Sequence, residues 1–387
     1  MFDLTEEQLM VRNMCREFAQ NELKEQAVEI DRTHQFPLET TKKLGELGIM
    51  GIVYPESYGG AGMDYMSYVI AVEEISRVCA SSGVIVAAHN SLCVSPIYYF
   101  GTDEQKKKYL PKLCRGEHIG AFALTEPEAG SDSGGTKTVA AKNGSGYILN
   151  GSKNFISNGA YADVHIALAV TDKNAPKNKN STFFIIEKGD PGFSVGKVED
   201  KLGICASSTT EMIYEDCHLP EDRMLGEQGE GFKIAMHTLD GGRVGVAAQA
   251  LGIAQAALDA AAAYANVRKQ FGAPIAKLQA IQWMIADMAT EIECARLLVY
   301  KAAQVLDKNG KNRRPAGKYT AMAKLYASEC AHRATHKCLQ IHGGYGYVKD
   351  YIAERLYRDA RITEIYEGTS EVQRLVIASN VLSEYEE

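Results

Sequence analysis

One glutamate near the end of the chain, Glu367, stands where a carboxylate could serve as a general base. It lies between a tyrosine and a glycine in the segment IYEGTSEVQR, residues 365–374. A carboxylate in apolar surroundings becomes more basic and can take a proton from carbon. Most glutamates are instead solvated surface charges, so these residues by themselves leave both interpretations of Glu367 open.

A second polar pair, Asp240 and Arg243, is separated by three positions along the chain. On a helix the two side chains share one face. They could hold a charged ligand, or they could simply pair with each other, as exposed residues of this spacing often do.

Two cysteines and two histidines lie close together in residues 330–338, which raises the question of a metal site. His332 and His336 are one helical turn apart and could share a metal ion. Cys330 and Cys338 do not fall on that face together with both histidines. We therefore expect no metal site, with the cysteines as thiols of a helical bundle and the histidines at a surface or interface.

Two common nucleotide-binding sequences are missing from the chain. No G-x-G-x-x-G follows a strand and opens a helix, and no G-x-x-x-x-G-K-[ST] occurs. We therefore expect neither a Rossmann nor a P-loop enzyme, and a nucleotide cofactor would need another architecture. The formal charge of -7 and the lack of a dense Lys/Arg cluster argue against nucleic acid as a partner.

The composition is that of a soluble globular protein with a large core. The chain has 387 residues, of which 45% are hydrophobic and 24% charged. It begins MFDLTEEQLM, without the segments of a secretory signal, and no apolar run of membrane-spanning length stands out. Nine cysteines without a C-x-x-C pair indicate reduced thiols. We expect a cytoplasmic protein without membrane insertion.

Hydrophobic patterns divide the chain into three parts, which must position the polar residues named above. Residues 1–120 favour helices, beginning with a capping box at Thr5 and Gln8. Residues 121–228 contain short β-type runs such as VHIALAV and TFFIIE, and the dipeptides Asn143-Gly144 and Asn150-Gly151 are typical of hairpins. A compact antiparallel sheet or a small barrel is expected there.

Residues 229–387 are expected to form a four-helix bundle. The segment AAQALGIAQAALDAAAAYANVRKQF is alanine-rich and favours helix. Pro274, the polar stretch 307–315 and the sequence His342-Gly343-Gly344 interrupt the helical pattern. Long helices joined by short connections at these points make a bundle. Trp283 is expected in its core.

Six motifs, in order along the chain, give a specific family resemblance. They are FALTEPEAGSD at 122–132, NFISNG at 154–159, LDGGRVGVAAQALGIAQ at 239–255, RKQFGAPI at 268–275, QIHGGYGY at 340–347 and IYEGTSEVQR at 365–374. With this set the chain resembles the acyl-CoA dehydrogenases, FAD enzymes that desaturate acyl-CoA thioesters between the α and β carbons. The family's layout of helical domain, β domain and four-helix bundle agrees with the three parts of the chain.

The resemblance implies a role for Glu367. Desaturation requires a base for the α proton and an acceptor for the β hydride, which in the family is the flavin N5. There the thioester carbonyl is held by the ribityl 2′-hydroxyl and by the backbone N–H of the residue matching Glu367, whose carboxylate is the base. Family members with the base elsewhere carry Glu just before the arginine matching Arg243. This chain has Gly242 at that position.

The resemblance also implies cofactor and substrate positions, several of which the family supplies from a neighbouring subunit of a homo-oligomer, usually a tetramer. Arginine suits phosphate, and paired glycines allow close backbone approach. The implied flavin positions are Phe122, Leu124, Thr125, Ser131, Phe155, Ile156, Ser157, Thr369 and Glu371, with Arg268, Phe271, Gln279, Gln340, Gly343 and Gly344 for the pyrophosphate and adenosine. The implied thioester and CoA positions are Ser131, Asp240, Arg243 and Gly368.

The stretch TLDGGRVGVAAQALGIAQ resembles the short-chain, butyryl-CoA branch of the family. Glutaryl-CoA dehydrogenases carry an arginine that SSGVIVAAHNSL lacks, so a short, uncharged acyl group is expected, with His89 or Tyr366 able to adapt the pocket to a branched or polar short chain. The expected electron acceptor is an electron-transferring flavoprotein. The alternatives are an acyl-CoA oxidase of the same fold and a non-redox acyl-CoA-binding scaffold. A bacterial cytoplasmic location is favoured over the mitochondrial matrix.

Overall fold

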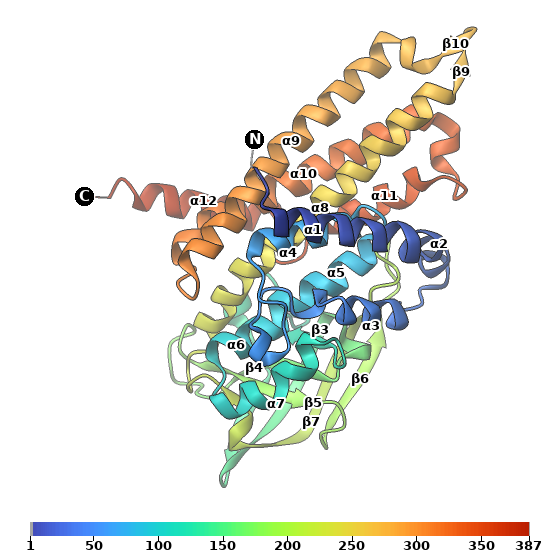
Figure 1. Cartoon of the computed structure of the whole chain (residues 1–387). Helices are drawn as coiled ribbons and strands as arrows, with labels where there is room; N and C mark the ends of the chain where they lie inside the picture. Colours follow the sequence, from blue (N-terminus) through green and yellow to red (C-terminus); the bar gives the residue numbers. More distant parts are fainter. Residues whose placement is uncertain (1–2, 387) are drawn as a thin grey trace.

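The computed structural model describes residues 3–386 and arranges them as helices, a sheet and helices again (Figure 1). The sheet lies at one end of the molecule, and the long C-terminal helices extend away from it at the other (Figure 1). The N-terminal helices lie between these two parts. The predicted three-part fold is therefore confirmed.

The N-terminal part begins with the predicted capping box, in which Thr5 and Gln8 exchange hydrogen bonds of 3.0 and 3.2 Å. Every residue of α4 and α5 is buried, because these two helices are covered on all sides. Two π-helical segments, Ala19–Leu23 and His89–Val94, interrupt the α-helical runs. The helices are α1 Glu6–Phe18, α2 Lys24–Thr33, α3 Leu38–Glu46, α4 Tyr65–Ser76, α5 Ala80–Ala88, α6 Ser95–Phe100 and α7 Asp103–Cys114.

The central part is one eight-stranded sheet with the strand order β6-β7-β3-β2-β4-β5-β8, and β1 pairs with β4 outside that path. The sheet is not wholly antiparallel as expected, since β1 and β2 both run parallel to β4. The strands are β1 Gly120–Ala123, β2 Val139–Asn143, β3 Gly146–Ser157, β4 Val164–Val170, β5 Ser181–Glu187, β6 Phe193–Val198, β7 Thr209–Pro220 and β8 Met224–Leu225.

The two predicted hairpin dipeptides have different outcomes. Asn143-Gly144 does form the turn between β2 and β3, with Gly144 at a φ of +59°. Asn150-Gly151 lies instead inside β3, where the register against β7 shifts between Leu149 and Gly151. The second prediction was wrong because asparagine and glycine also suit a β-bulge, which needs the same backbone freedom as a turn.

The C-terminal part is the predicted bundle of long helices, which pack around α8 and α10. The breaks fall where the sequence placed them: a short β9–β10 hairpin around Pro274, a turn within 310–316 and a 3₁₀ segment from Gly343. The elements are α8 Gly231–Val267, β9 Lys269–Gln270, β10 Ala273–Pro274, α9 Gln279–Asn309, α10 Gly317–His342, α11 Ile352–Arg361 and α12 Ser370–Ser383.

Helix α8 is the central helix of the molecule. Among the described residues it is the one helix long and apolar enough to cross a membrane, a property that the sequence analysis missed because alanine and glycine dominate its composition. Of its most apolar window, 78% is buried inside the protein, as in the core helix of a soluble protein. The prediction for Trp283 was wrong, since this residue on α9 is 64% exposed.

Candidate active site

Glu367 lies in a tight turn that connects the 3₁₀ segment Ile362–Glu364 to helix α12. Its φ is +51°, and the next residue, Gly368, has a φ of +91°. A left-handed backbone costs free energy at a residue other than glycine and persists only where surrounding contacts hold it. Thr369 then begins α12 as its N-cap, accepting a hydrogen bond from the N–H of Val372 at 3.3 Å.

Two buried side chains stabilise this turn by donating hydrogen bonds to its carbonyl groups. The amide of Gln373 donates to the carbonyl oxygens of Glu367 and Gly368 at 3.2 and 2.8 Å. The ammonium group of Lys324, on α10, donates to the carbonyl of Gly368 at 2.7 Å. Both side chains are fully buried. Neither Lys324 nor Gln373 is predictable from the sequence, because both reach the turn only through the packing of α10 and α12.

The carboxylate of Glu367 points at helix α8 and the π-helical segment. A Cβ atom built on Gly242 would lie 2.0 Å from the Oε2 atom of Glu367 and 2.9 Å from Leu92. That oxygen is buried and has no hydrogen-bond partner among the described residues. Burial raises the pKa of Glu367 to about 7, although Lys324 and Arg243 lower it in part. The Glu367 carboxylate can therefore exchange a proton near neutral pH.

Only a residue without a side chain fits at Gly242 beside this carboxylate. With Glu367 as the predicted base, we expect Gly242→Ala to lower turnover by roughly 10²-fold, because a displaced base loses its alignment. The added methyl group would push the carboxylate aside without disturbing the backbone of α8. Steady-state kinetics and the thermal unfolding midpoint would be measured together. Gly134→Ala is the matched control, since its Cβ would meet nothing closer than 3.7 Å. An unchanged kcat in Gly242→Ala would contradict the placement of the carboxylate.

Asp240 and Arg243 pair with each other, as one of the two interpretations of the sequence anticipated. The guanidinium Nη1 lies 2.5 Å from the Asp240 carboxylate, and Arg243 is buried while Asp240 is partly exposed. Burial raises the pKa of Asp240, and the neighbouring arginines oppose this. The pair lies on the same helix as Gly242, and the charge of Arg243 lowers the pKa of Glu367. Its role in binding a thioester or CoA stays a prediction.

The predicted flavin positions of the β domain lie at the ends of β1 and β3. The carbonyl of Thr125 accepts a hydrogen bond of 2.8 Å from the N–H of Asn154, which joins the two segments. Phe155 has a φ of +58° and a side chain that is 63% exposed. An aromatic ring held outward is a surface on which a planar ring can lie. Phe122 and Ile156 are buried, Leu124, Thr125 and Ser157 are half-buried, and Ser131 is exposed.

A buried ion pair braces this part of the β domain. The ammonium of Lys153 lies 2.7 Å from the carboxylate of Glu126 and donates to the carbonyl of Leu124 and the hydroxyl of Thr136 at 3.0 Å each. The Glu126 carboxylate also accepts from the N–H of Lys137 at 2.6 Å. Lys153 is 0% and Glu126 5% exposed. The network therefore fixes the backbone from Leu124 to Glu126. No local pattern along the chain predicts this network.

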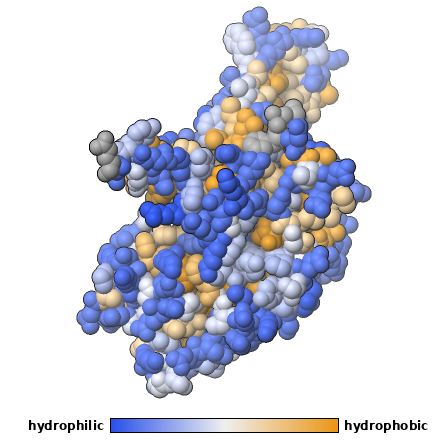
Figure 2. Space-filling model, turned by 60° about the vertical axis from the view of Figure 1, so that its left-hand side comes forward, coloured by the Kyte–Doolittle hydropathy of each residue, from blue (hydrophilic) through white to orange (hydrophobic). Residues whose placement is uncertain are grey.

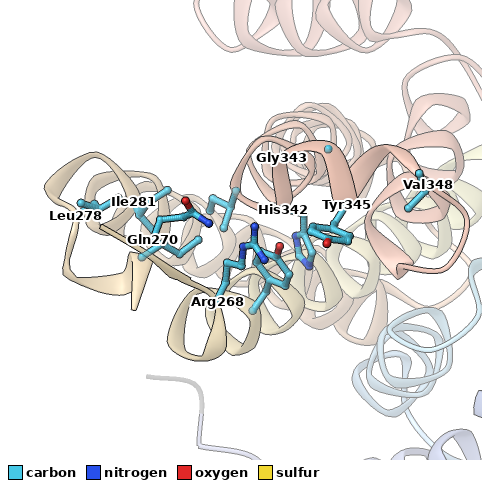
Figure 3. Close-up of a pocket in the computed structure, with 12 residues that line it drawn as sticks. Arg268, Gln270, Leu278, Ile281, His342, Gly343, Tyr345 and Val348 are labelled. Carbon is cyan, nitrogen blue, oxygen red and sulfur yellow. The ribbon is translucent and has the colours of Figure 1, made fainter. Parts of the chain in front are cut away.

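A second group of predicted positions lines a cavity of about 560 Å³ between the start of α9 and the end of α10 (Figure 3). Arg268, Gly343 and Gly344 are part of its wall. The guanidinium of Arg268 stacks on the ring of Tyr345 at 5.1 Å, and Figure 3 shows His342 beside them. A Cβ on either glycine would meet nothing within 4 Å, so a ligand can approach this backbone closely.

The remaining predicted positions lie outside both groups. Phe271, Gln279 and Gln340 are exposed, with Phe271 at 91% and at a φ of +51°. Neither Glu367 nor any β-domain residue lines the cavity between α9 and α10. One chain therefore presents an aromatic and backbone surface for a planar ring in one place and an arginine and glycine surface for phosphate in another. These two chemistries are those that a flavin nucleotide requires.

Comparison with known proteins relates the whole chain to one family. Protein-family models match the N-terminal, middle and C-terminal domains of acyl-CoA dehydrogenase at residues 5–117, 121–217 and 229–382. A short-chain specific acyl-CoA dehydrogenase of Clostridium acetobutylicum is 56% identical over 98% of this chain and 99% of its own length.

Solved structures agree with this. The butyryl-CoA dehydrogenase of Megasphaera elsdenii is 47% identical, with a TM-score of 0.96 over 99% of this chain and 100% of its own. A chain solved in work on the electron transferring flavoprotein of Acidaminococcus fermentans is 51% identical, with a TM-score of 0.96 over 99% of both chains. The protein therefore belongs to the acyl-CoA dehydrogenase family of FAD enzymes and is an acyl-CoA dehydrogenase.

Proposed function

We propose that the protein desaturates a short-chain acyl-CoA of the butyryl-CoA type to the trans-2-enoyl-CoA, with Glu367 as the base that takes the α proton. The observation that carries this proposal is the buried, unpartnered Oε2 atom of Glu367 and its pKa of about 7. A base with a pKa near the working pH combines a large ionised fraction with enough basicity for proton transfer. The backbone N–H of Glu367 donates to no group of residues 3–386 and is available for the thioester carbonyl.

FAD, when bound, supplies the acceptor for the β hydride at its N5. The segment from Phe122 to Thr125, with Phe155 and Ser157, would hold the ring system. Arg268, Gly343 and Gly344 would hold the phosphates. The residues of this chain would bring the substrate's α carbon to Glu367 and exclude water from the carboxylate.

The space near Glu367 supports a short acyl group. One turn along α8 from Gly242, a Cβ on Gly245 would lie 2.5 Å from the hydroxyl of Tyr68. One further turn along, the amide of Gln249 donates to the carbonyl of Ala80 at 3.0 Å and accepts a short hydrogen bond from the hydroxyl of Tyr366. These contacts pack α8 tightly against α4, α5 and Tyr366 next to the base. A long acyl chain would have to displace these side chains.

The contacts of His89 do not support the prediction that this residue adapts the acyl pocket. Its two ring nitrogens are engaged by the carbonyl of Leu113 and the N–H of Gly120, both at 3.0 Å. The ring is fully buried, and burial lowers its pKa to about 4, so it stays neutral. Tyr366 is the one of the two candidates that lies beside the base.

The substrate prediction is tested by steady-state kinetics with butyryl-CoA, octanoyl-CoA and glutaryl-CoA, using an electron-transferring flavoprotein as acceptor. We expect kcat/KM for butyryl-CoA to exceed that for octanoyl-CoA and glutaryl-CoA by at least roughly tenfold, since each rejected chain must displace buried groups or bury a carboxylate. Oxygen consumption without a carrier should be slow. A preference for octanoyl-CoA would overturn the short-chain proposal, and rapid oxygen consumption would favour the oxidase alternative.

The electron acceptor in this proposal is an electron-transferring flavoprotein, supported by the likeness to the chain from the Acidaminococcus fermentans work. The bacterial relatives support the predicted cytoplasmic location. Both remain predictions for this protein.

We further propose that the protein works as a homo-oligomer, with a tetramer as the expected form. The end of α8, β9, β10 and the start of α9 project from the rest of the molecule (Figure 1). Apolar side chains are exposed on this projection, and Figure 2 shows apolar surface on it and where it joins the rest of the molecule. Large exposed apolar areas mark interaction sites in soluble proteins. A neighbouring subunit would cover Phe271 and Trp283 and place the exposed Gln279 near a second chain's cofactor. Exposed residues of this region include Val267, Phe271, Leu278, Trp283 and Leu297.

A further inference from the structure

Lys324 occupies an unusual position for a lysine. It lies in the interior of α10 with 0% exposure, and its ammonium group donates to the Gly368 carbonyl. No carboxylate of the described residues lies within salt-bridge distance of it. A buried, unpaired cation costs stability, and a methionine or leucine of similar length would fill the space without that cost. A stability argument therefore does not account for a lysine here.

The charged groups around Lys324 come from several elements. Arg243 faces it from α8, Glu364 from the 3₁₀ segment before the turn, Glu371 from α12 and Glu367 from the turn itself. Arg243 is already paired with Asp240, Glu364 is paired with Arg361, and Glu371 is exposed. The buried carboxylate of Glu367 is the remaining anion.

The titratable neighbours of Glu367 also indicate an interaction between Glu367 and Lys324. Lys324 and Arg243 are the cations that lower its pKa against the effect of burial. Tyr68 of α4 is buried and the adjacent Tyr366 is half-buried. Desolvation of the two phenol groups raises the pKa of both, so both are neutral at pH 7. Burial lowers the pKa of Lys324 to about 8, with Glu367 opposing, so it remains largely protonated at neutral pH.

We propose that Lys324 is a positioning residue for Glu367, whose ammonium group both fixes the left-handed turn that carries this carboxylate and favours its ionised, proton-accepting form. The proposal rests on Glu367 being the base. Gln373 stabilises the same turn through neutral hydrogen bonds, so the two residues contribute differently to it. Gln373 supplies geometry alone, whereas Lys324 supplies geometry and a positive charge that is little screened by water.

The test separates the charge of Lys324 from its hydrogen bond. Lys324→Gln keeps a hydrogen-bond donor without the charge, Lys324→Met removes both, and Gln373→Met removes neutral hydrogen bonds to the same turn. Exchange of the substrate's α protons with D₂O would be followed by NMR from pH 5.5 to 9 under anaerobic conditions, together with kcat/KM. FAD content and thermal midpoint would be recorded for each variant.

Wild type should show an acid limb near pH 7, where Glu367 titrates. Removing the cation raises the pKa of Glu367, so both Lys324 variants should move this limb upward by on the order of one pH unit. At pH 6 that shift is a roughly tenfold loss of rate. Gln373→Met should lower the rate at every pH and leave the limb in place.

An unshifted limb in both Lys324 variants would overturn the proposal and leave Lys324 as a structural hydrogen-bond donor. Since Lys324→Gln retains the donor, it keeps the test informative if Lys324→Met fails to fold. Glu367→Gln distinguishes a wrong assignment of the base from a wrong role for Lys324. If that variant still exchanged α protons, the base itself would be wrongly assigned, whereas loss of exchange with an unshifted limb in the Lys324 variants would reject the role of Lys324 alone.

Discussion

Glu367→Gln should lower turnover by roughly 10²- to 10⁴-fold while FAD content stays normal, because a positioned general base contributes about that much to a rate. The amide has nearly the shape of the carboxylate, so the turn, its two hydrogen bonds from Gln373 and the contact of Lys324 with Gly368 are all retained. The measurement is kcat with butyryl-CoA, accompanied by the flavin absorption spectrum.

The same variant should not lose stability at alkaline pH. The folded-state pKa of Glu367 is raised from 4.5 to about 7, so ionisation of this group disfavours the folded state as the pH rises through that range. Glutamine avoids this cost. We therefore expect the thermal midpoint of Glu367→Gln at pH 8 to equal or exceed that of wild type. Near-normal turnover in this variant would show that another residue is the base.

The second large effect is expected on stability, at the buried pair of Lys153 and Glu126. Lys153→Met should lower the free energy of unfolding by about 3–5 kcal/mol at pH 7, since removing one member leaves the other as an unpaired buried charge. The Leu124 carbonyl beside the predicted flavin positions also loses its donor, so FAD affinity should fall too. Urea unfolding at saturating FAD would measure the stability.

The pH dependence follows from the shifts of this pair. Burial favours the neutral form of Glu126, but Lys153 and the neighbouring donors outweigh it and bring its pKa to about 2, so this group's contribution is present above pH 4.5 and is lost as the pH falls toward 2. In Lys153→Met the carboxyl can protonate instead, so the deficit should shrink as the pH is lowered from 7 to 5.

Two variants complete this experiment. Lys137→Met breaks a pair with Glu128 in which both side chains are about two-thirds exposed, and it should leave stability almost unchanged. Lys153→Met combined with Glu126→Leu should recover much of the loss, because no unpaired charge remains. A single Lys153→Met variant as stable as wild type would contradict the account of this network.

Local patterns were sufficient to predict the order of the parts and several of their boundaries. The capping box at Thr5, the hairpin at Asn143-Gly144 and the end of α10 at Gly343 each depend on residues within a few positions of one another. Asn150-Gly151 was misread because a bulge and a turn ask for the same backbone freedom. Trp283 was misread because a helical pattern along the sequence does not distinguish a buried face of a helix from an exposed apolar one.

The candidate site was predictable only in part. Glu367 and Gly242 could be selected because the family motifs name them. Three features depend on contacts between distant segments. They are the left-handed turn at Glu367, the hydrogen bond from Lys324 to Gly368, which lies 44 positions later in the chain, and the Lys153 network. No spacing rule along the sequence contains that information, so only the folded arrangement reveals it.

Oxidation of butyryl-CoA with Glu367 as the base is tested by the visible absorption spectrum of the purified holoenzyme under anaerobic conditions, before and after one equivalent of butyryl-CoA. We expect butyryl-CoA to bleach the flavin band of wild type and to leave that of Glu367→Gln unbleached on the same time scale. A wild-type flavin band untouched by butyryl-CoA would contradict the proposed substrate and reaction, and equal bleaching in both proteins would contradict the assignment of Glu367.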